Sequence, residues 1–425
     1  MLPTRLRKHK YHWKIVWAAL MVVFGLLAPL RTHAASIIAE LNLPASSGPI
    51  SLTTGPDNNI WFTGAGGDYI GRMTPSGTVT QFALPSAGQL PMVITPGPDG
   101  NLWFTLQTAG AIGKITPSGT ITEYPLGDPV SREPIGIVAG PDGNLWFALS
   151  KDGTIGRITP SGVITRFTAS GQPTLITAGP DGNLWFTDQL NDKIGKITMG
   201  GVVTEYALPQ ANSLPTGIAT GPDGNLWFAE QAGRIGKITP SGTITEYSLA
   251  VGVLPSVIIA GLDGKLWFND LSAGGNAIMS LDTSGNVVDT LPIPTANAYP
   301  YGLAMGPDNN IWFTQLFGNK IGYVTESNGG VSPSPTSSPS ASPSPTVNPG
   351  GETPLQLPRV GAFGGGLAVI LGGCFAAFAF LRHRNRRSVL TARVISAARK
   401  IAVEDELQIH HRLPVDTIGA PDDQA

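Results

Sequence analysis

The sequence predicts an all-β protein whose body is a seven-bladed β-propeller with four-stranded blades, and two observations predict it. The motif GPDGNLWF or a close variant occurs seven times, with Trp residues spaced 42, 43, 39, 42, 40 and 45 positions apart. Gly and Pro account for 54 and 37 of the 425 residues, which indicates many tight turns. A repeat of this length that contains several short β-rich runs is typical of a propeller blade.

Each repeat contains the same four predicted strands in the same order. A Pro-led apolar strand leads into the GPDG turn, a second strand carries Trp-Phe, a third resembles KIGKI, and a TPSG turn precedes a fourth such as TITEY. Asp-Gly and Ser-Gly favour the positive φ angles of tight hairpins, and the runs between them are rich in β-branched and aromatic residues. We expect the recurring Trp-Phe to pack between blades, so function is expected where the blades differ.

The start of the body is predicted to close the ring. The seventh repeat passes from residues 321–325 into a Ser/Pro-rich segment without a fourth strand of its own. Residues 37–44, IIAELNLP, match that missing strand and precede the first GPD turn. We therefore expect them to complete the seventh blade of a body that covers residues 35–328, which removes an open sheet edge.

The two ends of the chain predict export and membrane anchoring. Residues 1–34 are typical of a signal peptide, with an uncleaved signal anchor as the alternative. Residues 360–381 are apolar, uncharged and followed by Arg residues, which predicts one transmembrane helix and a cytoplasmic tail over residues 382–425. Residues 329–358, rich in Ser and Pro, predict an extended stalk. A sortase signal near residues 357–361 is the other interpretation of this end.

Charge and reactive side chains exclude several functions for the body. Residues 35–328 hold 12 Lys and Arg against 22 Asp and Glu, a net charge of about -10, which disfavours nucleic-acid binding. The single Cys is at position 374, and the six His are at 9, 12, 33, 383, 410 and 411. The body therefore has no thiolate and no imidazole, and chemistry based on paired carboxylates stays open.

The repeats resemble those of the virginiamycin B lyase, or streptogramin lyase, family. The resemblance rests on GPDGNLWFT at 97–105, IGKITPSGTITEY at 112–124 and GNKIGY at 318–323, and it covers roughly residues 36–328. It implies a seven-bladed propeller that opens the ester of a cyclic depsipeptide antibiotic by elimination, with a His base and Mg²⁺.

The residues that the family uses for this elimination are not matched. The family's two His follow the Pro that opens each of the last two blades, where this chain has Ser256 and Tyr301. A family Glu precedes the last of these Pro residues, where Tyr299 stands, and another falls near Gln315 and Leu316. Elimination by a His base is therefore not expected here.

The third residue after each Trp varies between blades and supplies candidate site residues. These seven positions are Gly64, Leu106, Leu149, Asp188, Glu230, Asp270 and Gln315. Three consecutive acidic blades predict a rim of the channel that binds a cation, an amine or a sugar, with Mg²⁺ or Ca²⁺ as the metal at Asp188, Glu230 and Asp270. The alternative is that each carboxylate accepts hydrogen bonds from its own loop.

Tyr299 and Tyr301 are the other candidate site residues. They flank the Pro that opens the last blade, where other blades have smaller residues such as Thr174 and Ser256. Two Tyr residues can form an aromatic platform for a sugar or a peptide, or they can fill the mouth of the channel.

These observations favour a membrane-anchored, surface-displayed propeller that binds an extracellular small molecule, glycan or protein. The alternatives are an enzyme, either a metal-assisted lyase or a carboxylate-based one acting on an ester or glycan, and a structural spacer. Asp188, Glu230 and Asp270 are the candidate residues for the enzyme.

Overall fold

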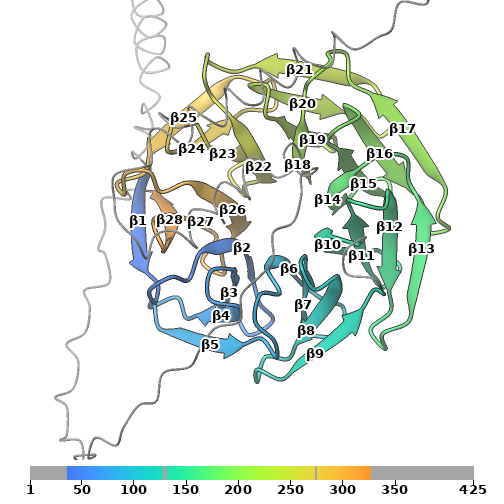
Figure 1. Ribbon diagram of the computed structural model, residues 1–425. Coiled ribbons are helices and arrows are strands. Elements are labelled where there is room, and N and C mark those ends of the chain that lie inside the picture. The colour runs from blue at the N-terminus through green and yellow to red at the C-terminus, as the bar shows by residue number, and fades with distance from the viewer. Residues whose placement is uncertain (1–35, 128–131, 273–274, 327–425) are drawn as a thin grey trace, which may run out of the picture.

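The computed structural model describes residues 36–127, 132–272 and 275–326, and these form seven four-stranded antiparallel sheets around a central axis (Figure 1). The predicted all-β propeller is confirmed. Within these residues, no helix is long and apolar enough to cross a membrane. The predicted signal peptide, stalk, transmembrane helix and tail lie outside the described residues.

The first strand of each blade lies nearest the axis and beside the first strands of both neighbouring blades. These strands are β2 (Pro49–Thr54), β6 (Pro91–Pro96), β10 (Pro134–Ala139), β14 (Pro173–Ala178), β18 (Pro215–Thr220), β22 (Pro255–Ala260) and β26 (Pro300–Met305). The second strands, which carry Trp-Phe, are β3 (Ile60–Gly64), β7 (Leu102–Leu106), β11 (Leu145–Leu149), β15 (Leu184–Asp188), β19 (Leu226–Glu230), β23 (Leu266–Asp270) and β27 (Ile311–Gln315).

The third and fourth strands complete each blade towards the outside (Figure 1). The third strands are β4 (Tyr69–Met73), β8 (Ala111–Ile115), β12 (Thr154–Ile158), β16 (Lys193–Ile197), β20 (Arg234–Ile238), β24 (Ala277–Leu281) and β28 (Lys320–Glu326). The fourth strands are β5 (Val79–Ala83), β9 (Ile121–Pro125), β13 (Ile164–Thr168), β17 (Val203–Ala207), β21 (Ile244–Ser248), β25 (Val287–Pro292) and β1 (Ser36–Asn42).

Strand β1 closes the ring as the sequence predicts. It pairs antiparallel with β28, in a register that runs from Ser36 opposite Glu326 to Asn42 opposite Lys320. The first described strand is therefore the fourth strand of the seventh blade, and main-chain hydrogen bonds join the two ends of the propeller. Numbering the blades from β2, blade 7 consists of β26, β27, β28 and β1.

The recurring Trp side chain is fixed by a hydrogen bond from its indole N–H and by packing of its ring. In each blade its indole N–H donates to the Asp of the GPDG turn, for example from Trp185 Nε1 to Asp181 Oδ1 at 3.0 Å. Partial burial acts in the opposite direction, but hydrogen bonds from Asn183 and Trp185 hold the pKa of Asp181 below its ordinary value. The ring packs between blades, as predicted: Trp61 of blade 1 shares a buried cluster with Phe104 of blade 2.

A bulge at the start of each first strand shapes the inner end of the blade. In blade 4, Pro173 pairs with Asp188 and the next pair joins Ile176 to Phe186, so two residues oppose Thr187. The Thr187 hydroxyl accepts a hydrogen bond from Leu175 N at 3.3 Å and donates to Thr216 O of blade 5 at 2.7 Å. The Thr187 hydroxyl thus gives the bulged strand a hydrogen-bond acceptor and also bonds the neighbouring blade.

The antiparallel strands give the propeller two different faces. One face carries the turns between the first and second strands and between the third and fourth strands; we call it the turn face. The other carries the loops between the second and third strands and the connections from one blade to the next, and we call it the loop face. The repeated turns make the turn face regular, so the variable segments lie on the loop face.

Candidate functional site

The four polar candidates at the third position after Trp lie where their second strands reach the loop face, but they are buried. Asp188, Glu230 and Gln315 have no exposed side-chain surface, and Asp270 is 3% exposed. Buried carboxylates need hydrogen-bond donors, so the partners of each one indicate its role.

Asp188 and Asp270 bind backbone groups of their own blades. Asp188 accepts hydrogen bonds from Gln172 N at 2.9 Å and from Asn191 Nδ2 at 2.9 Å. Asp270 accepts from Leu254 N at 3.0 Å and Ser272 N at 2.9 Å. Asn191 and Ser272 belong to the loop that follows each carboxylate, as the alternative interpretation expects, whereas Gln172 and Leu254 directly precede the opening Pro.

Gln315 belongs to the closure of the ring. Its Nε2 donates to Glu40 Oε1 at 2.9 Å, and Glu40 Oε2 also accepts from Lys320 Nζ at 2.8 Å. Burial tends to raise the pKa of Glu40, but hydrogen bonds from Lys320, Gln315 and Thr295 outweigh it and lower that pKa below its ordinary value. This position therefore joins the first described strand to blade 7.

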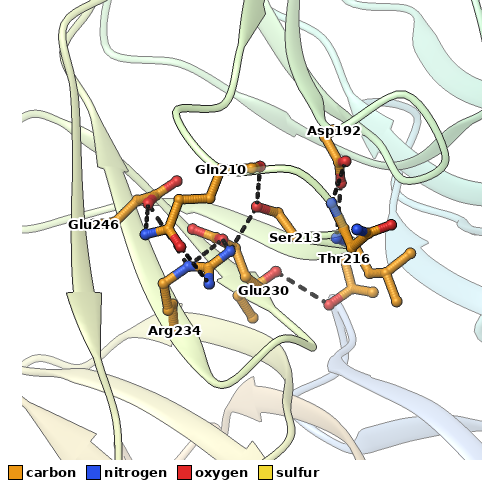
Figure 2. Close-up of polar contacts among 10 residues, drawn as sticks. Asp192, Gln210, Ser213, Thr216, Glu230, Arg234 and Glu246 are labelled. Atoms are coloured by element: carbon orange, nitrogen blue, oxygen red, sulfur yellow. Dashed lines mark hydrogen bonds and ion pairs between the residues drawn. The ribbon is translucent and has the colours of Figure 1, made fainter.

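Glu230 lies in a polar cluster with Arg234, Glu246, Gln210 and Ser213 in blade 5 (Figure 2). Arg234 Nε donates to Glu230 Oε2 at 2.9 Å, and Arg234 Nη2 forms an ion pair with the same oxygen at 2.7 Å. The same guanidinium donates to Ser213 Oγ at 2.7 Å and to Gln210 Oε1 at 3.3 Å. Burial and the nearby charge of Glu246 raise the pKa of Glu230, although Arg234 opposes them.

The carboxylates on blades 4, 5 and 6 do not converge on one point. Each has partners within or beside its own blade, and within residues 36–127, 132–272 and 275–326 no group of three or more His, Cys, Asp or Glu side chains is arranged to hold a metal ion. The geometry gives no support to a shared Mg²⁺ or Ca²⁺ site at Asp188, Glu230 and Asp270. Cation binding stays a prediction for titration to decide.

Tyr299 and Tyr301 do come together, and they form an aromatic cluster on the loop face. Their ring centroids lie 6.3 Å apart with planes 19° from parallel, and the ring of Phe317 lies 4.9 Å from that of Tyr299. All three side chains are half-buried. The residues beneath and beside them come from blades 7, 1 and 2 and are Ile50, Ala65, Leu90, Met92, Val93 and Leu316.

The backbone at Tyr299 is held in an unusual conformation. Its φ is 53°, in the left-handed region, and its carbonyl accepts a hydrogen bond from Leu316 N at 3.1 Å. A bulky non-Gly residue with positive φ costs on the order of 1–3 kcal/mol and persists only where the surroundings fix it. Leu90, Glu133 and Leu214, which directly precede the opening Pro in blades 2, 3 and 5, also have positive φ, so this conformation belongs to the repeat.

Phe317 was not predicted from the sequence. It lies in the loop between the second and third strands of blade 7, at a position that holds Gly66 in blade 1, Thr108 in blade 2 and Ser272 in blade 6. An aromatic residue in a variable loop was the available signal. Its proximity to Tyr299 depends on the fold of two separate segments.

The residue after the opening Pro differs between two sides of the ring. Blades 7, 1 and 2 place Tyr301, Ile50 and Met92 there. Tyr301 belongs to the aromatic cluster, and Ile50 and Met92 pack against it. Blades 4, 5 and 6 have the small polar residues Thr174, Thr216 and Ser256, which are buried. The inner end of the propeller on the loop face therefore has an apolar side and a polar side.

A sequence model of the virginiamycin B lyase family matches residues 31–170 and 131–351 of the chain. A solved structure of streptogramin B lyase is 35% identical with a TM-score of 0.64, and the match covers 68% of this chain and 97% of that one. A catalytically inactive His-to-Ala variant of virginiamycin B lyase from Staphylococcus aureus has been solved with quinupristin. It is 37% identical with a TM-score of 0.65, and the match covers 68% of this chain and 99% of that one.

A more distant likeness concerns the fold alone. The extracellular domain of a hybrid two-component system from B. thetaiotaomicron is 17% identical, with a TM-score of 0.55, over 69% of this chain and 42% of that one. No curated protein matches the chain.

Proposed function

The chain belongs to the virginiamycin B lyase family, and from this we propose that it is a ligand-binding member of the family that does not perform a His-dependent elimination. The observation that carries this proposal is the aromatic cluster of Tyr299, Tyr301 and Phe317. Tyr301 stands where the resemblance expects a His base, so a side chain suited to stacking replaces one suited to proton transfer.

The chemistry of the propeller supports binding over elimination. No His lies between residues 36 and 326, and the relative that has lost one His is catalytically inactive. Two of the candidate carboxylates, Asp188 and Asp270, are engaged with backbone N–H groups and are buried. A buried carboxylate that already accepts two or more hydrogen bonds is poorly placed to remove a proton from a substrate.

The ligand class follows from the same cluster. Half-buried Tyr and Phe rings favour the flat faces of sugar rings or the apolar side chains of a peptide. The body has a net charge of about -10, counted as 12 Lys and Arg against 22 Asp and Glu, which favours neutral or cationic ligands over anionic ones. The ligand is thus an extracellular glycan, a small molecule or an exposed peptide of a protein partner.

The ends of the chain support display at the cell surface. The signal peptide over residues 1–34 would export the propeller, and the apolar segment over residues 360–381 would hold it in the membrane. The Ser/Pro-rich stalk over residues 329–358 would separate the two. Binding at the loop face then occurs outside the cell.

Calorimetry on the full chain in detergent tests the binding function, with quinupristin and a panel of neutral oligosaccharides as probes. We expect at least one probe to bind to the wild type and at least tenfold more weakly to Tyr301→Ser, which places the blade 6 residue type in blade 7. Tyr124→Phe is the matched control, because blades 1 and 3 have Phe82 and Phe167 at that position. The control should bind like the wild type.

Mass spectrometry of the same mixtures distinguishes binding from catalysis. Recovery of intact probe after prolonged incubation supports the binding function. Opening of the quinupristin ring or cleavage of an oligosaccharide by the wild type would establish the alternative, a lyase-like or carboxylate-based enzyme. Equal affinity of the wild type and Tyr301→Ser for every bound probe would refute the aromatic cluster as the site.

A further inference from the structure

The polar cluster of blade 5 contains two carboxylates for one guanidinium. Arg234 lies between Glu230 and Glu246, with Nη2 2.7 Å from Glu230 Oε2 and Nε 3.7 Å from Glu246 Oε2 (Figure 2). The side chains of Glu230, Glu246 and Arg234 are 0%, 7% and 12% exposed. With both carboxyls ionised, this buried cluster would carry a net charge of -1.

At the equivalent positions of blades 4 and 7, cations or hydrogen-bond donors match the carboxylates, whereas in blade 5 they do not. Blade 7 has one carboxylate and one ammonium, Glu40 and Lys320, with Gln315 at the third position. Blade 4 also has two carboxylates, but every oxygen has a donor. Asp188 accepts from Gln172 N and Asn191, and Glu205 accepts from Ser170 and Lys193.

Two carboxylate oxygens in blade 5 lack any such donor. Among the described residues, Glu230 Oε1 and Glu246 Oε1 are buried and have no hydrogen-bond partner. A buried carboxylate oxygen without a donor disfavours the ionised form, so such a group binds a proton or rearranges. Burial and the charge of Glu246 raise the pKa of Glu230, in agreement with this geometry.

No other charge near the cluster offsets the second carboxylate. Strands β18 and β22, which pack against β19, have no ionisable side chain, and neither does the connection over residues 208–214. On β20 the other cation, Lys237, lies 5.0 Å from the centre of the Trp227 ring. Asp192 of blade 4 is a further acid, and it accepts Asn212 N and Leu214 N of that connection.

Arg234 joins this cluster to the loop face. Its guanidinium holds Gln210 and Ser213 of the connection from blade 4, which leads through Leu214 to Thr216. Thr216 Oγ1 in turn donates to Ser256 O of blade 6 at 2.8 Å. Leu214 has a φ of 51°, as the residue before the opening Pro has in several other blades.

We propose that Glu230 binds a proton beside Arg234 and that release of this proton loosens residues 208–214, which makes blade 5 a pH-sensitive part of the loop face. When both carboxyls are ionised they repel one another, and opening of the connection lets water reach them. The proposal concerns blade 5 alone and does not depend on the ligand proposed for blade 7.

Amide hydrogen exchange of the full chain in detergent tests this, with protection of residues 208–214 followed from about pH 5 to about pH 9 and corrected for intrinsic exchange. In the wild type we expect the opening constant to rise by up to about tenfold per pH unit above the ordinary Glu pKa, because opening releases one proton. In Glu230→Gln, which copies the amide of blade 7, the slope should vanish. Glu205→Gln of blade 4 is the matched control and should keep the wild-type slope.

A flat wild-type profile, or a slope that Glu230→Gln retains, would overturn the proposal. If Glu230→Gln does not fold, Glu246→Gln serves instead. It removes the negative charge beside Glu230, so the exchange profile should flatten in the same way. Infrared spectra give a second readout at neutral pH. The wild type should show a carboxylic-acid C=O band that is absent from both Gln variants, and absence of that band from the wild type would contradict a proton bound at Glu230.

Discussion

Glu40 Oε2 accepts a hydrogen bond from Lys320 Nζ at 2.8 Å, across 280 positions of the sequence. Glu40 also accepts from Thr295 N and from Gln315 Nε2, so one carboxylate ties strand β1 to the connection into blade 7 and to two strands of that blade. Main-chain pairing of β1 with β28 closes the ring, and this side-chain cluster fixes the closure at the loop face.

Deletion of residues 36–44 is expected to unfold the propeller. The deletion removes all of β1 and exposes the edge of β28 along its whole length. Circular dichroism and thermal melting of the truncated chain check this. A soluble truncation with the wild-type melting temperature would show that closure does not depend on β1.

The hydrogen bonds of Glu40 should make the stability of the propeller depend on pH. Because the pKa of Glu40 is lowered in the folded state, its contribution is fully present above the unfolded Glu pKa of about 4.3 and is lost as pH falls through the folded value. Glu40→Gln should therefore unfold more easily at neutral pH and lose less stability than the wild type as pH falls below about 4. Urea titrations at several pH values measure both effects. Glu123→Gln in blade 2 serves as the control and should keep the wild-type acid profile.

Thr187→Ala is expected to lower the free energy of unfolding by about 1–3 kcal/mol, because it leaves Leu175 N and Thr216 O without their partner. Thr80→Ala, on an exposed outer strand, controls for the loss of a β-branched residue. Urea unfolding of both variants makes the comparison. Equal losses of unfolding free energy in the two variants would mean that the Thr187 hydrogen bond between blades 4 and 5 adds nothing to stability.

Gly156→Ala should destabilise blade 3 by about 1–3 kcal/mol, because a Cβ there would lie 2.2 Å from the ring of Phe147. Phe147→Leu should reduce that cost, since the smaller side chain leaves room. A double-mutant cycle measures the coupling. Additive effects would show that the Gly is required for some reason other than the ring.

Asp188→Ala is expected to destabilise blade 4 by about 1–3 kcal/mol with or without cations, because Gln172 N loses its acceptor. Melting temperatures of the wild type and the variant in Mg²⁺, in Ca²⁺ and in a chelator test this. A cation that stabilises the wild type, but neither Asp188→Ala nor the Asp188, Glu230 and Asp270 triple Ala variant, would instead support the predicted metal site.

A chain that ends at residue 328 should be released from the cell, because it keeps the predicted signal peptide and lacks the predicted anchor. The full chain should stay with the membrane fraction and lose its propeller to external protease. Immunoblots of medium, membrane and protease-treated cells distinguish these outcomes. Retention of the truncated chain in the membrane would point to an uncleaved signal anchor.

The sequence by itself determined the repeat, its strands and the closure. Each GPDG turn, each hydrogen bond from a Trp indole to the Asp of that turn and each strand pairing lies within one blade, so local chemistry specifies it. The closure was predictable because residues 37–44 match the one strand that blade 7 lacks. The paired Tyr299 and Tyr301 were also predictable as a candidate site, since only Pro300 separates them in the sequence.

Only the tertiary structure decided what the polar residues at the loop face do. Asp188 and Asp270 were expected on an open rim and are buried against the backbone before the next Pro, because the connection between blades folds over them. The proximity of Phe317 to Tyr299 and the position of Arg234 between two carboxylates likewise depend on which loops meet. The repeat pattern encodes each blade, whereas the surroundings of a side chain at a strand end depend on the path of a connection from the blade before it.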